Sequence, residues 1–367
     1  MDTTYDVAIV GTGRPHGTEG ATGWGMSHAH ARGYAATGRC RLVAVCDIVP
    51  DKARKFSDEH AGGEAAVFAD YREMLAEARP DIVSVCTWPH LHAPMATACA
   101  EAAGVRAVHC EKPMAPTWGE ARAMAAACKE RGVQLTFNHQ RRFLPAFEAA
   151  RQLVRDGAIG DLVRLEGACA NFFDWGTHWF DMFGFLNEES PAEWVIATVD
   201  ARRPVVVYGV PMETQGVAQI RYGNGVHGLL LTGTSQDAVG CQIRALGSEG
   251  ILELHGQPPH VRLKGGRGGA VAPEVEGEGK QGGNAISRGI ADLIESLEVG
   301  RSPRLAADNA LRATEVIFAA YESARRRGRV DLPLAIDDSP FRAMLDAGVF
   351  PDARTDDDRP VTEKMIR

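Results

Sequence analysis

The sequence predicts an α/β protein with a doubly wound parallel sheet, followed by an α+β domain built on an open, mainly antiparallel sheet. Two observations support this prediction. Over residues 6–137, short apolar runs alternate with helical patterns of 10–15 residues, which is typical of parallel βα units. Over residues 195–255, strand-like runs are separated by turns without helical patterns, which is typical of antiparallel sheet.

Length and composition agree with this division. The chain has 367 residues, more than one ordinary core holds, so we expect domains at 1–137 and 138–332 and a tail at 333–367. A net charge of −8, with only short basic clusters, argues against nucleic-acid binding. There is no basic leader, no membrane-length apolar stretch and no CxxC pairing among the eight cysteines, so we expect a cytoplasmic protein with free thiols and no membrane contact.

In the first domain, strands and helices are expected to alternate. The expected strands are 6–10, 42–46, 82–86, 105–110 and 133–137. The expected helices are 28–37, 50–60, 70–77, 91–103 and 117–131. Ligands of such sheets bind at the carboxyl ends of the strands. The polar or glycine residues that fall at these ends are Gly13, Asp47, Thr87, His90, Lys112 and Asn138.

The second domain shows a different pattern. A helix at 145–156 and a strand at 161–169 lead into short strands at 205–208, 217–221, 226–231, 242–246 and 251–254. A glycine-rich loop is expected at 264–283, before helices at 285–299 and 305–326. The tail has no strong pattern, and we expect an arm or a disordered segment there.

Residues 7–47 carry a pattern typical of a dinucleotide-binding Rossmann domain. A buried strand ends in Gly11-Thr12-Gly13, a helix follows, and the next strand ends in Asp47. Such a turn lets the backbone approach a pyrophosphate, and the acid accepts hydrogen bonds from ribose hydroxyls. We therefore expect Gly11, Gly13 and Asp47 to bind NAD. The alternative is a glycine-rich connection in an ordinary α/β protein, with Asp47 only capping the next helix.

This pattern is interrupted by residues 14–24, an insertion of about eleven residues. Ser27 stands where the third glycine belongs, and we expect Ser27 and His28, at the helix start, to contact the cofactor. The insertion is predicted to form a flap near the pyrophosphate. Ile48 follows Asp47, where an NADP site more often has arginine, so we expect NAD; the nearby basic residues that oppose this choice are Lys52, Arg54 and Lys55.

A second candidate site lies at residues 171–181. His178 is expected to open a helix after an N-capping Thr177, with Asp174 one turn upstream and Asp181 three residues on. A carboxylate beside an imidazole suits acid/base chemistry, because the acid orients the ring. The alternatives are a capping Asp174 with a hydrogen-bonded His178 and a solvated Asp181, or a three-ligand metal site. The metal site is the weaker alternative, because no further His/Cys cluster supports it, and we predict no metal.

Together with Glu111-Lys112-Pro113, this sequence resembles the glucose–fructose oxidoreductase / inositol dehydrogenase / MocA family from Val7 to about Pro333. The matching pieces are His30-Ala-Arg-Gly-Tyr34, Thr87-Trp-Pro-His-Leu-His92, Cys110-Glu-Lys-Pro-Met-Ala115, Arg141-Arg-Phe143, Asp174-Trp-Gly-Thr-His178 and Gly247-Ser-Glu-Gly-Ile-Leu252. The resemblance implies that Lys112 and His178 are catalytic and that Asp174 assists. It also implies that Glu111 and Lys112 lie on the cofactor side and that the Lys112-Pro113 bond is cis.

The implied activity is hydride transfer between NAD and a carbinol carbon of a sugar, cyclitol or related polyol. His178 would be the base, and Lys112 would stabilise the alkoxide; a lysine in that place is otherwise solvated or paired with Glu111. The candidates for substrate contact are Asn138, Arg142, Trp175 and Trp179, although the two indoles also fit a core role.

Several alternatives remain. Thr87 is expected near the nicotinamide together with one of His90 and His92, of which we choose His90; the alternative for these histidines is helix capping. An NAD-dependent glycosidase that uses transient oxidation and a non-catalytic NAD-binding regulator are the other function classes.

We also expect a homo-oligomer formed through the open sheet. The segment between Leu165 and Asp174 is shorter than the family's pocket loop, so the resemblance does not identify the substrate.

Overall fold

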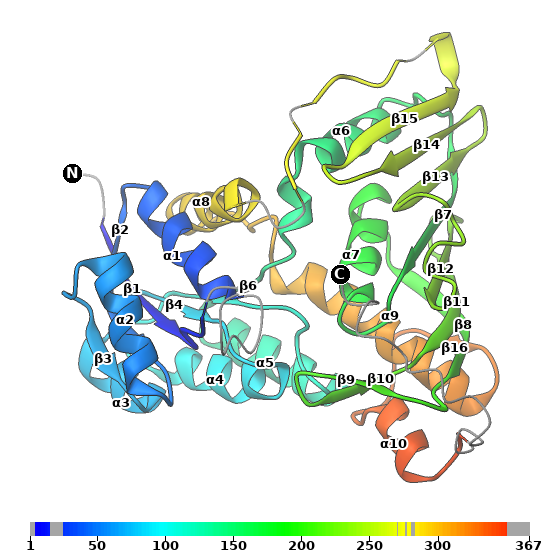
Figure 1. The fold of residues 1–367 in the computed structure, drawn as a ribbon. Coiled ribbons are helices and arrows are strands. Elements are labelled where there is room, and N and C mark those ends of the chain that lie inside the picture. Colours follow the sequence, from blue (N-terminus) through cyan, green and yellow to red (C-terminus); the bar gives the residue numbers. More distant parts are fainter. Residues whose placement is uncertain (1–3, 15–24, 270, 276, 280–282, 351–367) are drawn as a thin grey trace. The chain divides into compact units, whose positions relative to one another are not determined.

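The computed structural model describes residues 4–14, 25–269, 271–275, 277–279 and 283–350. The chain forms two compact units (Figure 1). The first consists of Met1–Ala115, Glu120–Phe143 and Gln281–Ala310, and the second of Pro116–Gly119, Leu144–Lys280 and Leu311–Arg367. The chain therefore passes between the units more often than boundaries at residues 137 and 332 predict.

The first unit contains a fully parallel sheet. Its strands are β1 Tyr5–Val10, β2 Cys40–Cys46, β3 Ala66–Phe68, β4 Ile82–Val85, β5 Ala107–Cys110 and β6 Gln134–Phe137. They lie in the order β3-β2-β1-β4-β5-β6. The predicted doubly wound sheet is confirmed, and its carboxyl strand ends share one edge. The sequence pattern did not indicate β3, because three residues are too few to show a periodicity.

A helix from late in the chain completes the core of this unit. The helices here are α1 Met26–Ala36, α2 Pro50–Ala61, α3 Tyr71–Ala78, α4 Pro89–Glu101, α5 Trp118–Glu130 and α8 Gly283–Val299. Figure 1 shows α8 beside α1, and Ile286 and Ile290 of α8 share one buried cluster with Tyr34 of α1. Gly33 allows this approach, because a Cβ there would lie 2.5 Å from Cδ1 of Ile290.

The second unit contains the larger sheet. Its strands are β7 Leu162–Cys169, β8 Ala192–Asp200, β11 Gln215–Tyr222, β12 His227–Gly233, β13 Ile243–Gly247, β14 Gly250–His255, β15 His260–Gly265 and β16 Val330–Asp331. Their order is β15-β14-β13-β7-β12-β11-β8-β16. The described neighbours are antiparallel except β7 and β12, which run parallel, so the prediction of a mainly antiparallel sheet is confirmed. Strands β9 Val205–Val207 and β10 Val210–Met212 form a separate hairpin.

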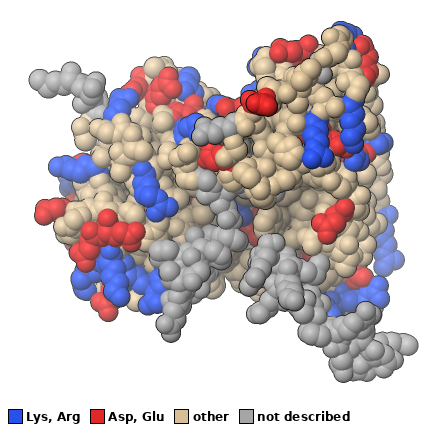
Figure 2. All heavy atoms as spheres, turned by 45° about the horizontal axis from the view of Figure 1, so that its top comes forward, with Lys and Arg blue, Asp and Glu red and all other residues tan. Residues whose placement is uncertain are grey.

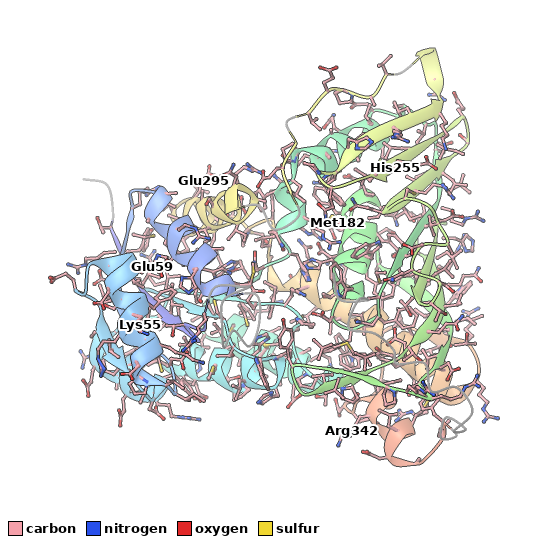
Figure 3. All side chains as sticks on the ribbon, in the orientation of Figure 1. Lys55, Glu59, Met182, His255, Glu295 and Arg342 are labelled. Atoms are coloured by element: carbon pink, nitrogen blue, oxygen red, sulfur yellow. The ribbon has the colours of Figure 1, made fainter. Side chains whose placement is uncertain are left out.

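One face of this sheet is covered by helices. The helices of the unit are α6 Pro145–Arg155, α7 Gly176–Leu186, α9 Ala307–Arg326 and α10 Pro340–Asp346. Along β11, Ala218, Ile220 and Tyr222 are buried and alternate with exposed side chains, the pattern of a half-covered strand. Helix α7 packs on β7 and β12, and its residue Met182, labelled in Figure 3, is fully buried. Among the described helices, none is both long and apolar enough to cross a bilayer.

The tail was expected to be an arm or a disordered segment, and the part that the structure describes is ordered. Helix α10 lies within it, and the ring of Phe341 packs 4.9 Å from that of Tyr321. The indole Nε1 of Trp118 donates to the carbonyl of Leu334 at 3.1 Å. A few buried aromatic contacts therefore order a segment whose own sequence shows no periodicity. Residues 351–367 and the insertion at 15–24 lie outside the described residues.

A buried carboxylate joins three parts of the second unit. Glu213 accepts hydrogen bonds from the backbone N–H of Phe172 at 2.6 Å, the hydroxyl of Thr232 at 2.9 Å and the hydroxyl of Tyr321 at 2.6 Å. It thereby ties the segment before α7 to β12 and α9. Burial raises the pKa of Glu213 to about 7, although the hydrogen bonds oppose this shift.

This raised pKa predicts a pH dependence of stability. Between its ordinary pKa of 4.5 and about 7, Glu213 holds its proton in the folded chain but loses it in the unfolded chain. Stability should therefore fall as pH rises through this range, by about 3 kcal/mol, and then stay level. Glu213→Gln keeps a neutral group there and should remove the slope.

Urea unfolding of both proteins at pH 5 and pH 8 measures this effect. The stability of Glu213→Gln relative to wild type should rise by about 3 kcal/mol from the lower to the higher pH. Glu193→Gln, at an exposed position of β8, is the matched control. Identical pH dependence in wild type and Glu213→Gln would show that Glu213 does not hold a proton in the folded state.

Candidate functional site

The glycine turn of the first unit is fastened to Asp47. Oδ2 of Asp47 accepts hydrogen bonds from the N–H of Thr12 at 3.1 Å, the hydroxyl of Thr12 at 3.0 Å and the N–H of Gly13 at 3.2 Å. The turn follows β1 and Asp47 follows β2, neighbouring strands of one sheet. The structure therefore brings the predicted glycines and acid together at the carboxyl edge.

Gly11 and Ser27 explain how this turn is built. Gly11 has a φ of +84°, and a Cβ on it would lie 2.7 Å from the carbonyl oxygen of Cys86, so no other residue fits without strain. The buried hydroxyl of Ser27 donates to the carbonyl of Thr12 at 2.6 Å. Ser27 thus replaces the third glycine with a hydrogen bond that holds the start of α1 against the turn.

The alternative role of Asp47 as a helix cap does not match the geometry. Helix α2 has Val49 as its N-cap, with no side-chain capping bond, and Pro50 as its first residue. Oδ1 of Asp47 accepts from the N–H of Val49 at 2.9 Å, which supports the loop before the helix. Ile48 is 90% exposed, so the position after the acid faces solvent.

Glu111, the residue before Lys112, is the centre of a buried polar network. One of its oxygens, Oε1, lies 3.0 Å from Nε2 of His30 and accepts from the amide of Asn138 at 2.7 Å. Nδ1 of His30 lies 3.1 Å from the hydroxyl of Ser84. Burial alone would raise the pKa of Glu111, but the hydrogen bonds from His30 and Asn138 and the charge of Lys112 bring it down to about 2.

This network determines the surroundings of three predicted residues. Glu111 is ionised and buried, Asn138 holds it, and Lys112 follows it in a turn whose Lys112-Pro113 bond is cis, as expected. The network includes His30 and Ser84, whose roles the sequence analysis did not identify. The only signal for His30 was its place in the matching piece that ends at Tyr34, and Ser84 lay inside a strand pattern.

His92, and not His90, connects two strand ends. Its Nδ1 lies 2.8 Å from the carbonyl of Pro113 and its Nε2 lies 3.0 Å from the carbonyl of Thr87. Burial lowers the pKa of His92, so at neutral pH the ring has one N–H and donates to one carbonyl at a time. His90 is exposed in the first turn of α4, and the N-cap of this helix is Trp88, whose side chain makes no capping hydrogen bond.

In the second unit, Asn171 shapes the start of α7. Its Oδ1 accepts from the N–H groups of Asp174 at 2.7 Å and Trp175 at 3.1 Å, and its carbonyl accepts from Gly176 at 2.8 Å. The helix begins at Gly176 with Trp175 as N-cap. The predicted N-cap at Thr177 is therefore wrong, because Asn171 already satisfies the amide groups that precede the helix.

The chemically active side chains at this helix start are all buried. Asp174, His178 and Asp181 are 8%, 5% and 2% exposed. A solvated Asp181 is therefore excluded. Among the described residues, the groups of three donors that converge within 4.8 Å lie elsewhere.

The predicted substrate residues differ in their surroundings. Trp179 is buried and donates from Nε1 to the carbonyl of Gln242 at 2.7 Å, which favours the core role for this indole. Trp175 is only partly buried, and its ring centroid lies 6.2 Å from that of Trp179. Arg142 is buried in the short helix η1 Gln140–Phe143 of the first unit, as is Asn138 just before it. Substrate contact by these residues remains a prediction.

The surface shows no concentration of basic charge on the face seen in Figure 2. There, Lys and Arg are interspersed with Asp and Glu over the described residues. A nucleic-acid track would instead place basic side chains in one continuous stripe. On this face, the described Lys and Arg side chains form no such stripe.

Comparisons with known proteins place both units. Residues 5–139 match the description "Oxidoreductase family, NAD-binding Rossmann fold", and residues 165–332 match "Oxidoreductase family, C-terminal alpha/beta domain". D-apiose dehydrogenase of Paraburkholderia graminis is 35% identical over 135 residues, which cover 37% of this chain and 35% of that protein. The rhizopine catabolism protein MocA of Rhizobium meliloti is 25% identical over 87% of this chain and 95% of its own length.

A solved structure agrees in fold. The aldose–aldose oxidoreductase from Caulobacter crescentus, complexed with glycerol, has a TM-score of 0.71 and 23% identity, covering 90% of this chain and all of that chain. The D-apiose dehydrogenase match, by contrast, spans only about a third of that relative's length. With its Rossmann unit and its C-terminal unit both matched, this chain belongs to the Gfo/Idh/MocA family of oxidoreductases and has that family's NAD-binding fold.

Proposed function

We propose that this protein is an NAD-dependent dehydrogenase of a sugar, cyclitol or related polyol. The observation that carries the proposal is the single carboxyl edge of the first sheet. The glycine turn, Asp47 and Lys112 follow β1, β2 and β5 there. Relatives named as D-apiose dehydrogenase and aldose–aldose oxidoreductase support a sugar-like substrate.

In the proposed reaction, His178 takes the hydroxyl proton of the substrate as the C–H bond breaks. Lys112 donates a hydrogen bond to the same oxygen, which gains negative charge in the transition state. Asp174 holds the substrate hydroxyl or the imidazole. NAD, which the glycine turn and Asp47 would hold, would supply the nicotinamide that accepts the hydride. The buried Glu111 network fixes the turn that carries Lys112, and Asn171 with Glu213 fixes the segment that carries Asp174.

The C-terminal unit also has a face suited to self-association. Ile196 of β8 and Val217 of β11 are 43% and 36% exposed, and Leu229 and Leu231 of β12 are partly buried on the same face. We propose that a second copy covers this apolar face.

We also place the protein in the cytoplasm, which agrees with eight free cysteines.

A panel of sugars and cyclitols tests the function directly. Incubated with NAD, at least one member of the panel should produce NADH in proportion to substrate consumed. A glycosidase that uses transient oxidation would release aglycone with no net NADH. Tight NAD binding without turnover of any member would instead favour a non-catalytic regulator.

Replacement of His178 tests the proposed base. His178→Asn should lower kcat by about 10²–10⁴, the usual contribution of a positioned acid/base, while the Kd for NAD is unchanged. His260→Asn, at an exposed position of β15 in the same unit, is the control and should keep full activity. Wild-type turnover in His178→Asn would remove this residue from the mechanism.

Cofactor choice tests the role of Asp47. A 2′-phosphate about 4 Å from this carboxylate is repelled by up to ~4 kcal/mol at an effective dielectric constant near 20, which salt reduces. We therefore expect kcat/KM to favour NAD over NADP by two to three decades, at about 1.4 kcal/mol per decade. Asp47→Ser combined with Ile48→Arg should shift this ratio toward NADP.

The ratio is the informative quantity, because Asp47 also holds the glycine turn, and its loss lowers activity with both cofactors. Glu77→Ser removes an exposed acid near the end of α3 and should leave the ratio unchanged. A wild-type enzyme that uses both cofactors equally, or prefers NADP, would contradict the assignment of Asp47 to the ribose.

A further inference from the structure

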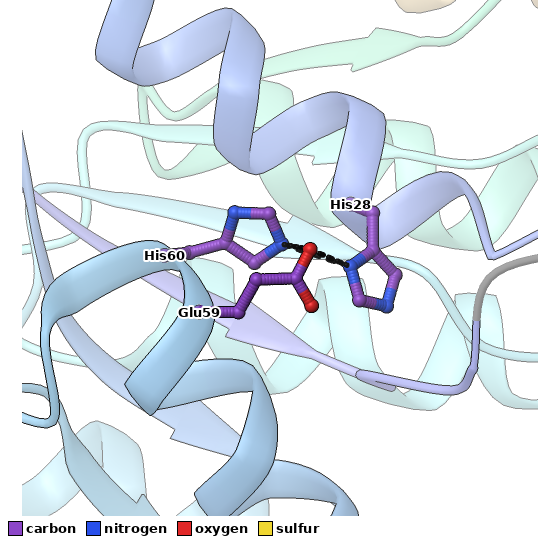
Figure 4. A group of neighbouring side chains, drawn as sticks. All are labelled: His28, Glu59 and His60. Carbon is purple, nitrogen blue, oxygen red and sulfur yellow. Dashed lines mark hydrogen bonds and ion pairs between the residues drawn. The ribbon is translucent and has the colours of Figure 1, made fainter.

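We propose that His28, Glu59 and His60 form a binding site for a divalent transition-metal ion, with zinc as the best match. His28 lies in the first turn of α1, and the other two residues end α2 (Figure 4). All three belong to the first unit. His28 is also a predicted cofactor contact, but none of the three side chains transfers a proton or a hydride in the proposed reaction. Figure 3 also labels Glu59 on α2.

The three donor atoms already have nearly the spacing of metal ligands. Nδ1 of His28 lies 3.5 Å from Oε1 of Glu59 and 2.8 Å from Nε2 of His60, and the last two atoms are 3.4 Å apart. Ligands about 2.0–2.1 Å from a tetrahedral zinc ion lie about 3.3–3.4 Å from one another. Two of the three donor–donor distances therefore fit. The distance between the two ring nitrogens has to increase by roughly half an ångström.

A metal ion would use both ring nitrogens as ligands, which the direct contact between the two rings does not allow. Two ring nitrogens at 2.8 Å share one proton, since one must donate and the other accept. A metal ion takes the lone pairs of both nitrogens and the charge of the Glu59 carboxylate together.

The surroundings suit this chemistry. His28 is 6% exposed, and the Phe56 ring lies 4.8 Å from its ring and 4.5 Å from that of His60. Arg32 is the opposing cation nearby, and its exposed position leaves its charge screened by water.

A second group of donors in the described residues is less suitable. Cys241, Glu253 and His255 also converge, with His255 labelled on β14 in Figure 3. The Glu253 carboxylate is already paired with Arg244, His255 and Lys264. Burial raises the pKa of Cys241 to about 11, so its sulfur is a thiol at neutral pH and not the thiolate that binds metals. The positively charged side chains paired with Glu253 would repel a metal cation at this place.

Metal titration of the full-length protein tests the proposal. After stripping with chelator and dialysis, the chain should bind one equivalent of Zn²⁺ by calorimetry, and its Tm should rise with Zn²⁺ concentration. Co²⁺ in place of Zn²⁺ should give visible bands of a nitrogen and oxygen site. A near-ultraviolet thiolate-to-cobalt band would place the ion on cysteine and overturn the assignment.

Three variants locate the ion. His28→Gln, His60→Gln and Glu59→Gln should each weaken Zn²⁺ binding at least ~100-fold, since even residues that only orient a ligand cost 10–100-fold. Glu59 is exposed, so its replacement tests the site without risk to the fold. Asp58→Asn, the neighbouring exposed acid, makes the same charge change and should bind as wild type. Unchanged binding in Glu59→Gln and His60→Gln, or no binding to wild type, would refute the proposal.

Discussion

Burying the Glu111 carboxylate imposes a constraint on which much of the first unit depends. An ion in a low-dielectric interior is tolerated only when donors surround it, and here they come from α1 and from the end of β6. His30 in turn reaches Ser84 of β4, so one charge connects a helix and three strands. The turn that carries Lys112 follows directly and takes its position from this network.

The second unit also buries a carboxyl group, but surrounds it with different donors. Glu213 and Glu111 are both buried, yet the pKa of Glu213 is about 7 and that of Glu111 about 2. The donors explain the contrast. Glu213 receives hydrogen bonds from neutral groups only, whereas Glu111 faces an imidazole and a lysine charge. The anion is therefore the stable form at Glu111, whereas the proton is readily held at Glu213.

Local patterns explain which parts of the fold and of the candidate site could be predicted from the sequence. The parallel sheet, the glycine turn and Asp47 follow from periodicity and from residues close together in the chain. The Thr177 cap was predicted wrongly, because a competing acceptor, Asn171, lies six residues upstream. The parallel pairing of β7 with β12 and the partners of Glu213 depend on contacts between residues 19 to 108 positions apart, which no local pattern records.

The return of α8 to the first unit has a consequence for how the protein folds during synthesis. The Rossmann strands are complete at Phe137, but Ile286 and Ile290 of α8, which cover the α1 face, are made almost 150 residues later. Until then, the apolar side of α1 around Gly33 and Tyr34 has no cover. The nascent nucleotide-binding unit must therefore wait for most of its partner unit to be translated before its core closes, and a fragment cut after β6 keeps that face open to aggregation.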